Sequence, residues 1–337
     1  MNCIIKWITL PFIILSFTTA VSATEASDLI NKKELEKWQL SEVTYPPSNP
    51  YQKATEELGK QLFFDPRLIG DRTLSCATCH FPGTGWSDPL PNSDNESNGM
   101  ARQAPTLINI AFQNNFFCDG RSHTLEEAIE LHLKELSIVA GDIPALPQAY
   151  QQEFQTAFGS TATNSTHIAK AIANFLRTIV VKDSAFDRWV AGDKAALSQS
   201  AKQGFLLFTG KAQCATCHSS PNFSDSKFHN TGLNTLDPGR FDVTGNPKEK
   251  NHFRTSALRQ VSDTAPYMHL GNKGTLMSVI EFYNRGGDRR NGGNKLHELH
   301  LTEKEEQALL DFLMSLTGSN ASVVIPQLPA NDASVSQ

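Results

Sequence analysis

Two copies of one pentapeptide, Cys-Ala-Thr-Cys-His, hold the residues of this 337-residue chain that are best suited to chemistry. They occupy positions 76–80 and 214–218. In a C-x-x-C-H motif the two thiols bond to the vinyl groups of a haem, and the histidine binds its iron. The sequence therefore predicts two covalently bound haem c groups. Their predicted attachment residues are Cys76, Cys79, Cys214 and Cys217, and the predicted proximal iron ligands are His80 and His218.

Three other uses of paired cysteines fit less well. The halves of a zinc ribbon lie about 15–20 residues apart, whereas these pairs begin at Cys76 and Cys214. A thioredoxin-like motif needs a βαβ pattern around it, and the flanking sequence shows none. Structural disulfides form in oxidising compartments, but they would not explain a histidine after each pair.

The N-terminus resembles a secretory signal. Lys6 precedes an apolar run at 7–17, and Val21-Ser22-Ala23 forms a cleavage-site pattern. The run is too short for a transmembrane helix, so we predict cleavage after Ala23, export to a bacterial periplasm and no membrane span after removal of the signal. The net charge of −5 implies neither nucleic acid nor an anionic membrane surface as a partner.

A degenerate repeat predicts the domain organisation. Gly59-Lys60-Gln61-Leu62-Phe63 precedes the first motif, and Gly204-Phe205-Leu206-Leu207-Phe208 precedes the second. Both read as a G-x-x-L-F helix that leads into a haem attachment site, which indicates a duplicated unit. We predict an all-α fold with two cytochrome-c-like haem domains and long loops packed around a shared interface. The predicted segments are a signal peptide at 1–23, domains at 24–190 and 191–319, and a disordered tail at 320–337.

Three helices are predicted from periodicity and capping signals. Helices at 124–136 and 302–316 each begin with a threonine that is followed three residues later by glutamate, a capping-box pattern. A third helix at 168–181 has apolar residues at helical spacing on one face.

Further segments extend the similarity to one family. They are Ala104-Pro105-Thr106-Leu107, Asp119-Gly120-Arg121, Phe228 to Gly232, Phe253 to Arg259, Thr264 to His269 and Glu281 to Gly287. In order and spacing, from about Leu58 to Leu316, the chain resembles the bacterial dihaem cytochrome c peroxidases and their MauG-like relatives. The resemblance implies that the N-terminal haem, on His80, meets peroxide and that the C-terminal haem, on His218, handles electrons.

The resemblance also implies what faces each iron. Peroxidases that need reductive activation have a second histidine before the A-P-T segment, but this chain has none between His80 and His123. The first iron is therefore expected to have an open position, with Met100 as the competing ligand. At the second iron, Tyr283 stands fourteen residues after His269, where ordinary peroxidases have methionine and MauG-like proteins have tyrosine. Tyrosinate favours ferric iron. The alternatives are that Tyr283 is a core aromatic residue and that the nearby Met268 is the ligand; we interpret Met268 as packing.

A calcium ion lies between the haems in many relatives. By position, its ligands here would be the Gln103 side chain and the carbonyls of Thr264 and Pro266. Relatives usually have asparagine at the first place. The amide oxygen of glutamine also suits calcium.

Three positions depart from the family pattern. Cys118 replaces the tryptophan before D-G-R, an electron relay between the haems; its alternatives are a small buried apolar residue or an inert thiol. Ala128 replaces a distal glutamine. The distal acid has no clear match, and Glu135 is the nearest candidate for this catalytic, proton-transferring role, unless it is a solvated helix residue.

The resemblance implies a periplasmic haem peroxidase that uses hydrogen peroxide to oxidise a periplasmic protein substrate or a small redox partner. The first alternative is a cytochrome c peroxidase that removes peroxide with electrons from a small electron-donor cytochrome. The second is an electron-transfer cytochrome without catalysis. His229 and His269 are expected to contact haem propionates or buried backbone. Haem propionates are also the expected partners of three arginines, Arg121, Arg240 and Arg254.

Overall fold

The computed structural model describes residues 31–69, 73–90, 94–95, 101–140, 146–233, 235–288, 296–319 and 323–330. The predicted signal peptide and Met100 lie outside these residues. Among the described helices, none is long and apolar enough to cross a membrane.

The described chain is mostly helical, as predicted, with only two short pairs of strands. The helices are α2 (Lys32–Glu36), α3 (Lys53–Phe64), α4 (Cys76–Cys79), α5 (Leu125–Ala140), α6 (Ala149–Phe158), α7 (Ser165–Leu176), α8 (Ala185–Val190), α9 (Gln199–Thr209), α10 (Phe241–Thr244), α11 (Leu276–Asn284) and α12 (Glu303–Met314). Antiparallel pairing joins β1 (Asp94–Asn95) to β2 (Ala101–Arg102), and β3 (Phe228–His229) to β4 (Phe253–Arg254).

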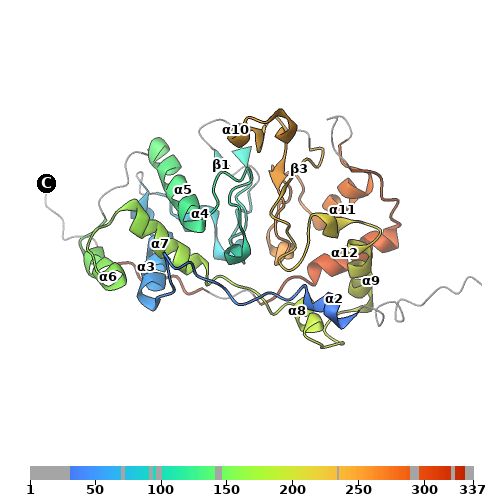
Figure 1. The fold of residues 1–337 in the computed structure, drawn as a ribbon, viewed down its shortest axis with the longest axis horizontal. Coiled ribbons are helices and arrows are strands. Elements are labelled where there is room, and N and C mark those ends of the chain that lie inside the picture. Colours follow the sequence, from blue (N-terminus) through green and yellow to red (C-terminus); the bar gives the residue numbers. More distant parts are fainter. Residues whose placement is uncertain are drawn as a thin grey trace, which may run out of the picture.

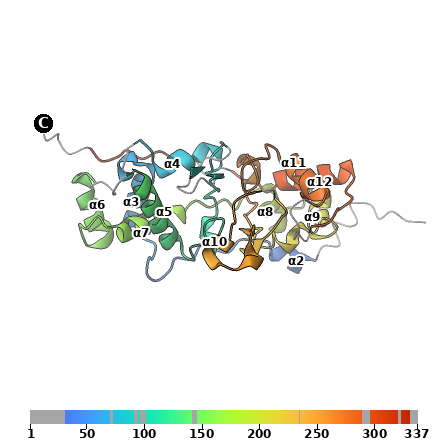
Figure 2. The same ribbon diagram turned by 90° about the horizontal axis from the view of Figure 1, so that it is seen from above.

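Two hydrophobic cores divide the molecule into two lobes. The first core is built mainly by α3, α5, α6 and α7, and the second by α8, α9, α11 and α12. Figure 1 shows the two groups of helices side by side, with β1 and β3 between them. The view from above in Figure 2 gives the same order along the long axis. That each lobe is a haem domain stays a prediction, as do the predicted domain boundaries.

The glycine of the G-x-x-L-F repeat allows two helices to cross at close range in each lobe. A Cβ atom at Gly59 would lie 1.8 Å from the carbonyl oxygen of Ala171, and one at Gly204 would lie 1.9 Å from that of Ala308. No side chain fits at such distances, so α3 can cross α7, and α9 can cross α12, only with glycine at these points. The G-x-x-L-F repeat thus marks two equivalent helix crossings, each before a Cys-Ala-Thr-Cys-His motif.

The three predicted helices are present, with shifted ends. The N-terminal capping box of α12, between Thr302 and Glu305, is confirmed. At α5 the Thr124 hydroxyl accepts from the Glu127 amide as predicted, but the Glu127 carboxylate accepts from the Ser122 hydroxyl and the His123 amide instead of from Thr124. The predicted helix at 168–181 is α7, which begins and ends earlier, at Ser165–Leu176.

At both ends of the described chain, a segment packs in the lobe opposite to the one that holds the nearest long helix in sequence. Trp38, just after α2, is buried in the second core, and its carbonyl accepts a 2.8 Å hydrogen bond from the buried guanidinium of Arg259. At the other end, Val323 packs against the first core, and the Pro329 carbonyl accepts a 3.0 Å hydrogen bond from Arg67. Figure 1 shows α2 beside α8, in the lobe opposite to α3 and α6. The lobes are therefore tied together by both ends of the chain as well as by the central strands.

Candidate active site

The first motif forms the short helix α4, which holds its two cysteines on one turn. His80 follows directly, and its Nδ1 lies 3.2 Å from the carbonyl oxygen of Trp86. A carbonyl can only accept, so Nδ1 carries the proton, and the lone pair of Nε2 is left for iron. Burial and repulsion from His132 lower the pKa of His80 to about 4. The ring is thus the neutral imidazole that a metal ligand requires.

The second motif repeats this arrangement. Nδ1 of His218 lies 2.9 Å from the carbonyl oxygen of Phe223, and burial lowers the pKa of the ring. Trp86 and Phe223 are both fully buried with positive φ angles of 58° and 55°. The strained backbone aims each carbonyl back at its histidine, so equivalent residues orient the two imidazoles.

The four motif cysteines form no disulfides. Burial raises the pKa of the Cys76 and Cys214 thiols to about 12, so they are protonated at neutral pH. A pair of thiols on one turn beside a neutral imidazole fits a haem c. Covalent attachment itself stays a prediction, as does each assigned role.

Helix α5 contains a residue that interacts with the first motif. Its residue His132 interacts electrostatically with His80, which places this part of α5 at the first site. One turn further on, the Glu135 carboxylate accepts two 3.1 Å hydrogen bonds from Arg121. Burial raises the pKa of Glu135, but His132 and Arg121 outweigh it, and the net pKa is lowered. The carboxylate is therefore ionised at neutral pH and can accept a proton.

Tyr283, on α11, lies beside the second motif. Burial raises its pKa well above the usual value, and the sulfur atoms of Cys214 and Cys217 raise it further. The side chain is therefore close enough to both sulfur atoms to interact with them electrostatically. A phenolate forms there only if a cation such as iron compensates its charge. Its neighbour Phe282 is fully buried and the two rings lie 5.3 Å apart, so Tyr283 also contacts a core residue, and its role as a ligand stays a prediction.

A chain of charged side chains runs between the two sites. Arg121, which holds Glu135, also donates a 2.9 Å hydrogen bond to Asp119. Asp119 accepts a second bond, of 2.8 Å, from Arg102, and Arg102 binds Asp237 through Nε and Nη2. His269 completes the chain, because its Nε2 lies 2.8 Å from the Asp237 carboxylate. From Glu135 to Asp237 the charges alternate in sign, which stabilises them away from water.

Sequence reasoning missed Arg102 and Asp237. The only signal was the D-G-R segment, which contains Asp119 and Arg121. Each member of the central pair is almost fully buried, with 6% and 2% of its side chain exposed. Buried ions need partners, but the sequence does not show which residues are buried.

Three residues expected near haem propionates have other partners. His229 pairs with Asp225 at 2.8 Å, as His269 does with Asp237. Arg240 donates to the carbonyls of Asp119 and Gly120.

The Arg254 side chain donates hydrogen bonds to the main-chain carbonyls of Phe117 and Thr255. Burial lowers its pKa although Cys118 opposes this effect. A haem propionate would supply the missing carboxylate, so Arg254 fits the expected role.

The Gln103 side chain carries an unsatisfied oxygen. Its Oε1 is buried without a hydrogen-bond partner, whereas Nε2 donates to the Asp88 carbonyl. The main-chain N–H of Gln103 donates a 3.2 Å hydrogen bond to the His269 carbonyl oxygen. This bond brings Gln103 to the segment that contains Thr264 and Pro266. A buried carbonyl oxygen without a donor suits a cation. The residues fit the predicted calcium site, which stays a prediction.

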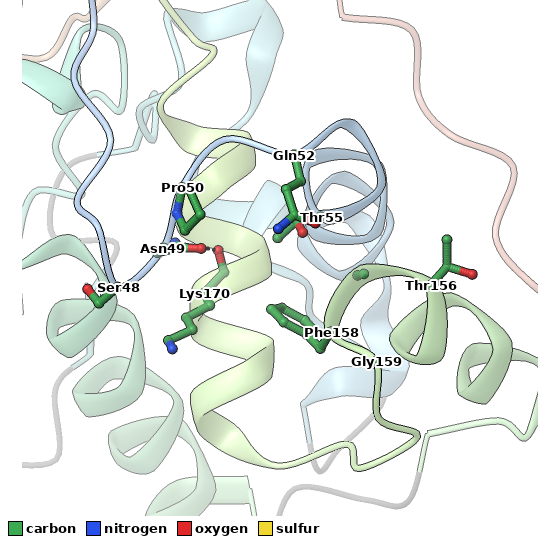
Figure 3. A pocket seen from close by; sticks show the side chains of 10 residues that line it. Ser48, Asn49, Pro50, Gln52, Thr55, Thr156, Phe158, Gly159 and Lys170 are labelled. Carbon is green, nitrogen blue, oxygen red and sulfur yellow. Dashed lines mark hydrogen bonds between the residues drawn. The ribbon is translucent and has the colours of Figure 1, made fainter.

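A pocket of about 410 Å³ lies apart from these residues, between α3, α6 and α7. Figure 3 shows its lining, in which Asn49 donates to the Lys170 carbonyl at 3.0 Å. Lys170 is its only titratable side chain. None of the predicted site residues contributes to it, and we assign it no chemistry.

Comparison with known proteins agrees with this geometry. Residues 53–195 match the family model described as di-haem cytochrome c peroxidase. The chain is 37% identical to the methylamine utilization protein MauG of Methylorubrum extorquens, over 85% of each chain. It is 35% identical to the cytochrome-c peroxidase IdrP2 of Denitromonas iodatirespirans, over 81% of this chain and 84% of that one. A solved structure, described as a MauG-like protein associated with microbial copper homeostasis, is 29% identical, with a TM-score of 0.71 over 84% of this chain and 95% of that chain. Two attachment motifs, each with an oriented histidine, and these relatives together show that the chain belongs to the dihaem cytochrome c peroxidase and MauG family of haem enzymes.

Proposed function

We propose that the protein is a periplasmic enzyme that uses hydrogen peroxide to oxidise a protein substrate or a small redox partner, with two covalent haem c groups. The observation that carries this proposal is the difference between the two sites. Tyr283 lies beside the second motif, whereas His132, Glu135 and Arg121 gather near the first.

When bound, haem would supply iron that reacts with peroxide at the first site and passes electrons at the second. The protein supplies proton transfer and orientation. The ionised Glu135 can take a proton from peroxide at its first oxygen and return it to the departing oxygen, which is general acid–base catalysis. Arg121 holds the Glu135 carboxylate in place with two hydrogen bonds, and the Trp86 and Phe223 carbonyls fix the two imidazoles.

Tyr283 distinguishes this function from ordinary peroxide removal. An anionic oxygen ligand lowers the reduction potential of its iron, so the second site would hold an oxidised state rather than a reduced one. Such a protein draws electrons from a substrate after meeting peroxide and does not need prior reduction.

The second candidate is a cytochrome c peroxidase that takes electrons from a small cytochrome. It is favoured by relatives whose names are cytochrome-c peroxidase, such as IdrP2.

Spectroscopy of the haem-loaded, fully oxidised protein tests the proposal. We expect one high-spin and one low-spin ferric haem, and a rapid loss of haem absorbance when peroxide is added without a reductant. A peroxide reaction that needs prior one-electron reduction would support the second candidate. Two low-spin haems that are inert to peroxide in both states would contradict both and leave an electron carrier.

A further inference from the structure

Three potential metal ligands meet between the two haem motifs. The Cys118 sulfur, an Asp237 carboxylate oxygen and an imidazole nitrogen of His269 all lie within 4.8 Å of one another. They come from three separate stretches of the chain. Cys118 precedes the D-G-R segment, Asp237 lies before α10, and His269 lies before α11. None belongs to a Cys-Ala-Thr-Cys-His motif.

We propose that Cys118 and His269, with Asp237 as a weaker third donor, bind a monovalent soft cation, Cu⁺. Thiolate and imidazole are the donors that copper and zinc prefer, and soft thiolate favours Cu⁺. A metal bonded at about 2.3 Å to sulfur and about 2.0 Å to nitrogen holds these atoms at most about 4.3 Å apart. The spacing in the structure is already close to this limit.

The surroundings hold the ligands in place. The His269 side chain is only 5% exposed, its ring stacks on Phe253 at 3.8 Å, and Asp237 is 2% exposed. Cys118 is anchored through its main chain, because its carbonyl accepts a 2.8 Å hydrogen bond from the Arg254 amide. A site on three buried or anchored residues needs little ordering when a cation binds.

Charge decides between a monovalent and a divalent cation. The guanidinium groups of Arg102 and Arg254 both interact electrostatically with Cys118. Arg102 is bound by the carboxylates of Asp237 and Asp119, and Asp119 also accepts from Arg121. Cu⁺ that replaces the thiol proton leaves the charge of the site unchanged. Zn²⁺ in the same place would add one positive charge among buried residues, beside Arg102 and Arg254, which is costly.

Binding balances in atoms and charge. The Cys118 thiol and Cu⁺ give a copper–sulfur bond and release one proton, with no change of oxidation state. Nearby guanidinium groups favour loss of this proton because they stabilise thiolate. His269 would bind through Nε2 with its proton on Nδ1. Asp237 would then lose its hydrogen bond from His269 but keep both bonds from Arg102.

Elemental analysis tests the site without an activity assay. The haem-loaded protein is incubated anaerobically with ascorbate and Cu⁺, or with Zn²⁺, and then freed of unbound metal by gel filtration. Haem iron provides an internal count, so we expect one copper for every two irons and at least tenfold less zinc. X-ray absorption at the copper edge should show one sulfur scatterer.

Two variants and a control complete the test. Cys118→Ser and His269→Gln should each retain at least tenfold less copper, with an unchanged iron content showing that both haems are still attached. His167→Asn, at a partly buried histidine on α7 whose ring stacks on Phe158, should retain copper as the wild type does. Copper absent from the wild type, copper retained equally by Cys118→Ser, or zinc retained in preference to copper would each overturn the proposal.

Discussion

Arg102 and Asp237 are joined by two hydrogen bonds, 2.7 Å from Nε and 3.0 Å from Nη2, although 135 positions separate them in sequence. Arg102 ends β2, and Asp237 precedes α10. A third bond from Arg102 reaches Asp119. One buried guanidinium therefore connects the segments that contain Arg102, Asp119 and Asp237.

Loss of this guanidinium should destabilise the fold. Arg102→Met keeps much of the side-chain volume but removes the buried guanidinium that binds both Asp237 and Asp119, and breaking a buried pair in this way costs about 3–5 kcal/mol. The free energy of unfolding, from denaturant titration followed by circular dichroism, should fall by that amount. Lys182→Met is the matched control, because Lys182 pairs with Glu42 on the surface, and its loss should cost at most about 1 kcal/mol. Equal effects of the two variants would contradict a structural role for Arg102.

Asp237 should make the protein sensitive to acid. Burial raises its pKa, but hydrogen bonds from His269 and Arg102 outweigh burial and hold the pKa well below the usual range. A folded-state pKa below the unfolded value of about 3.9 means that this stabilisation is complete above about pH 4 and is lost as the pH falls further, toward the folded-state pKa. Unfolding free energies measured from pH 5 to pH 2 should therefore fall more steeply in the wild type than in Asp237→Asn. If the unfolding free energies of the two proteins fall with equal slope, Asp237 does not contribute to the acid sensitivity.

The sequence predicted the local features of this fold but not its long-range contacts. Periodicity and capping signals sufficed for α5, α7 and α12 because they depend on residues a few positions apart. The glycines at 59 and 204 were recognised as a repeat, but their cause, a contact with another helix, became clear only from the structure. Arg102 and Asp237 could not be paired, since neither shows a local pattern. The same holds for Trp38, which packs in the second core although it precedes α3 of the first lobe.

Tyr283 is expected to control the second haem. In Tyr283→Phe the buried oxygen beside Cys214 and Cys217 is removed, so the absorption and electron paramagnetic spectra of that haem should change. Its reduction potential should rise, because an anionic ligand favours ferric iron. Tyr267→Phe is the control, since Tyr267 is a tyrosine that packs against the second core and burial raises its pKa to about 12. Unchanged spectra in Tyr283→Phe would exclude this tyrosine as the ligand.

Glu135 should determine the rate of the peroxide reaction. Glu135→Gln keeps the shape of the side chain but removes its capacity to accept a proton, and loss of a general acid–base group slows such a step by about 100-fold or more. Stopped-flow mixing with peroxide measures the rate constant, while the resting haem spectrum should stay the same. Glu130→Gln, on the same helix, controls for the change of charge on α5. If both variants react at the wild-type rate, another group transfers the proton.

Calcium should stabilise the protein through Gln103. The buried Oε1 of this side chain has no hydrogen-bond partner, and a cation bound there in the folded state alone would raise stability according to its concentration and affinity. Treatment of the haem-loaded protein with a calcium chelator should lower the melting temperature, and added Ca²⁺ should restore it, whereas Mg²⁺ should not, because it demands a tighter octahedral site. The melting temperature of Gln103→Leu should change neither with the chelator nor with added Ca²⁺. Gln113→Leu, at a partly buried glutamine of the same lobe, is the control that should still respond to Ca²⁺. If the chelator leaves the melting temperature of the wild type unchanged, no calcium ion binds at the unsatisfied oxygen.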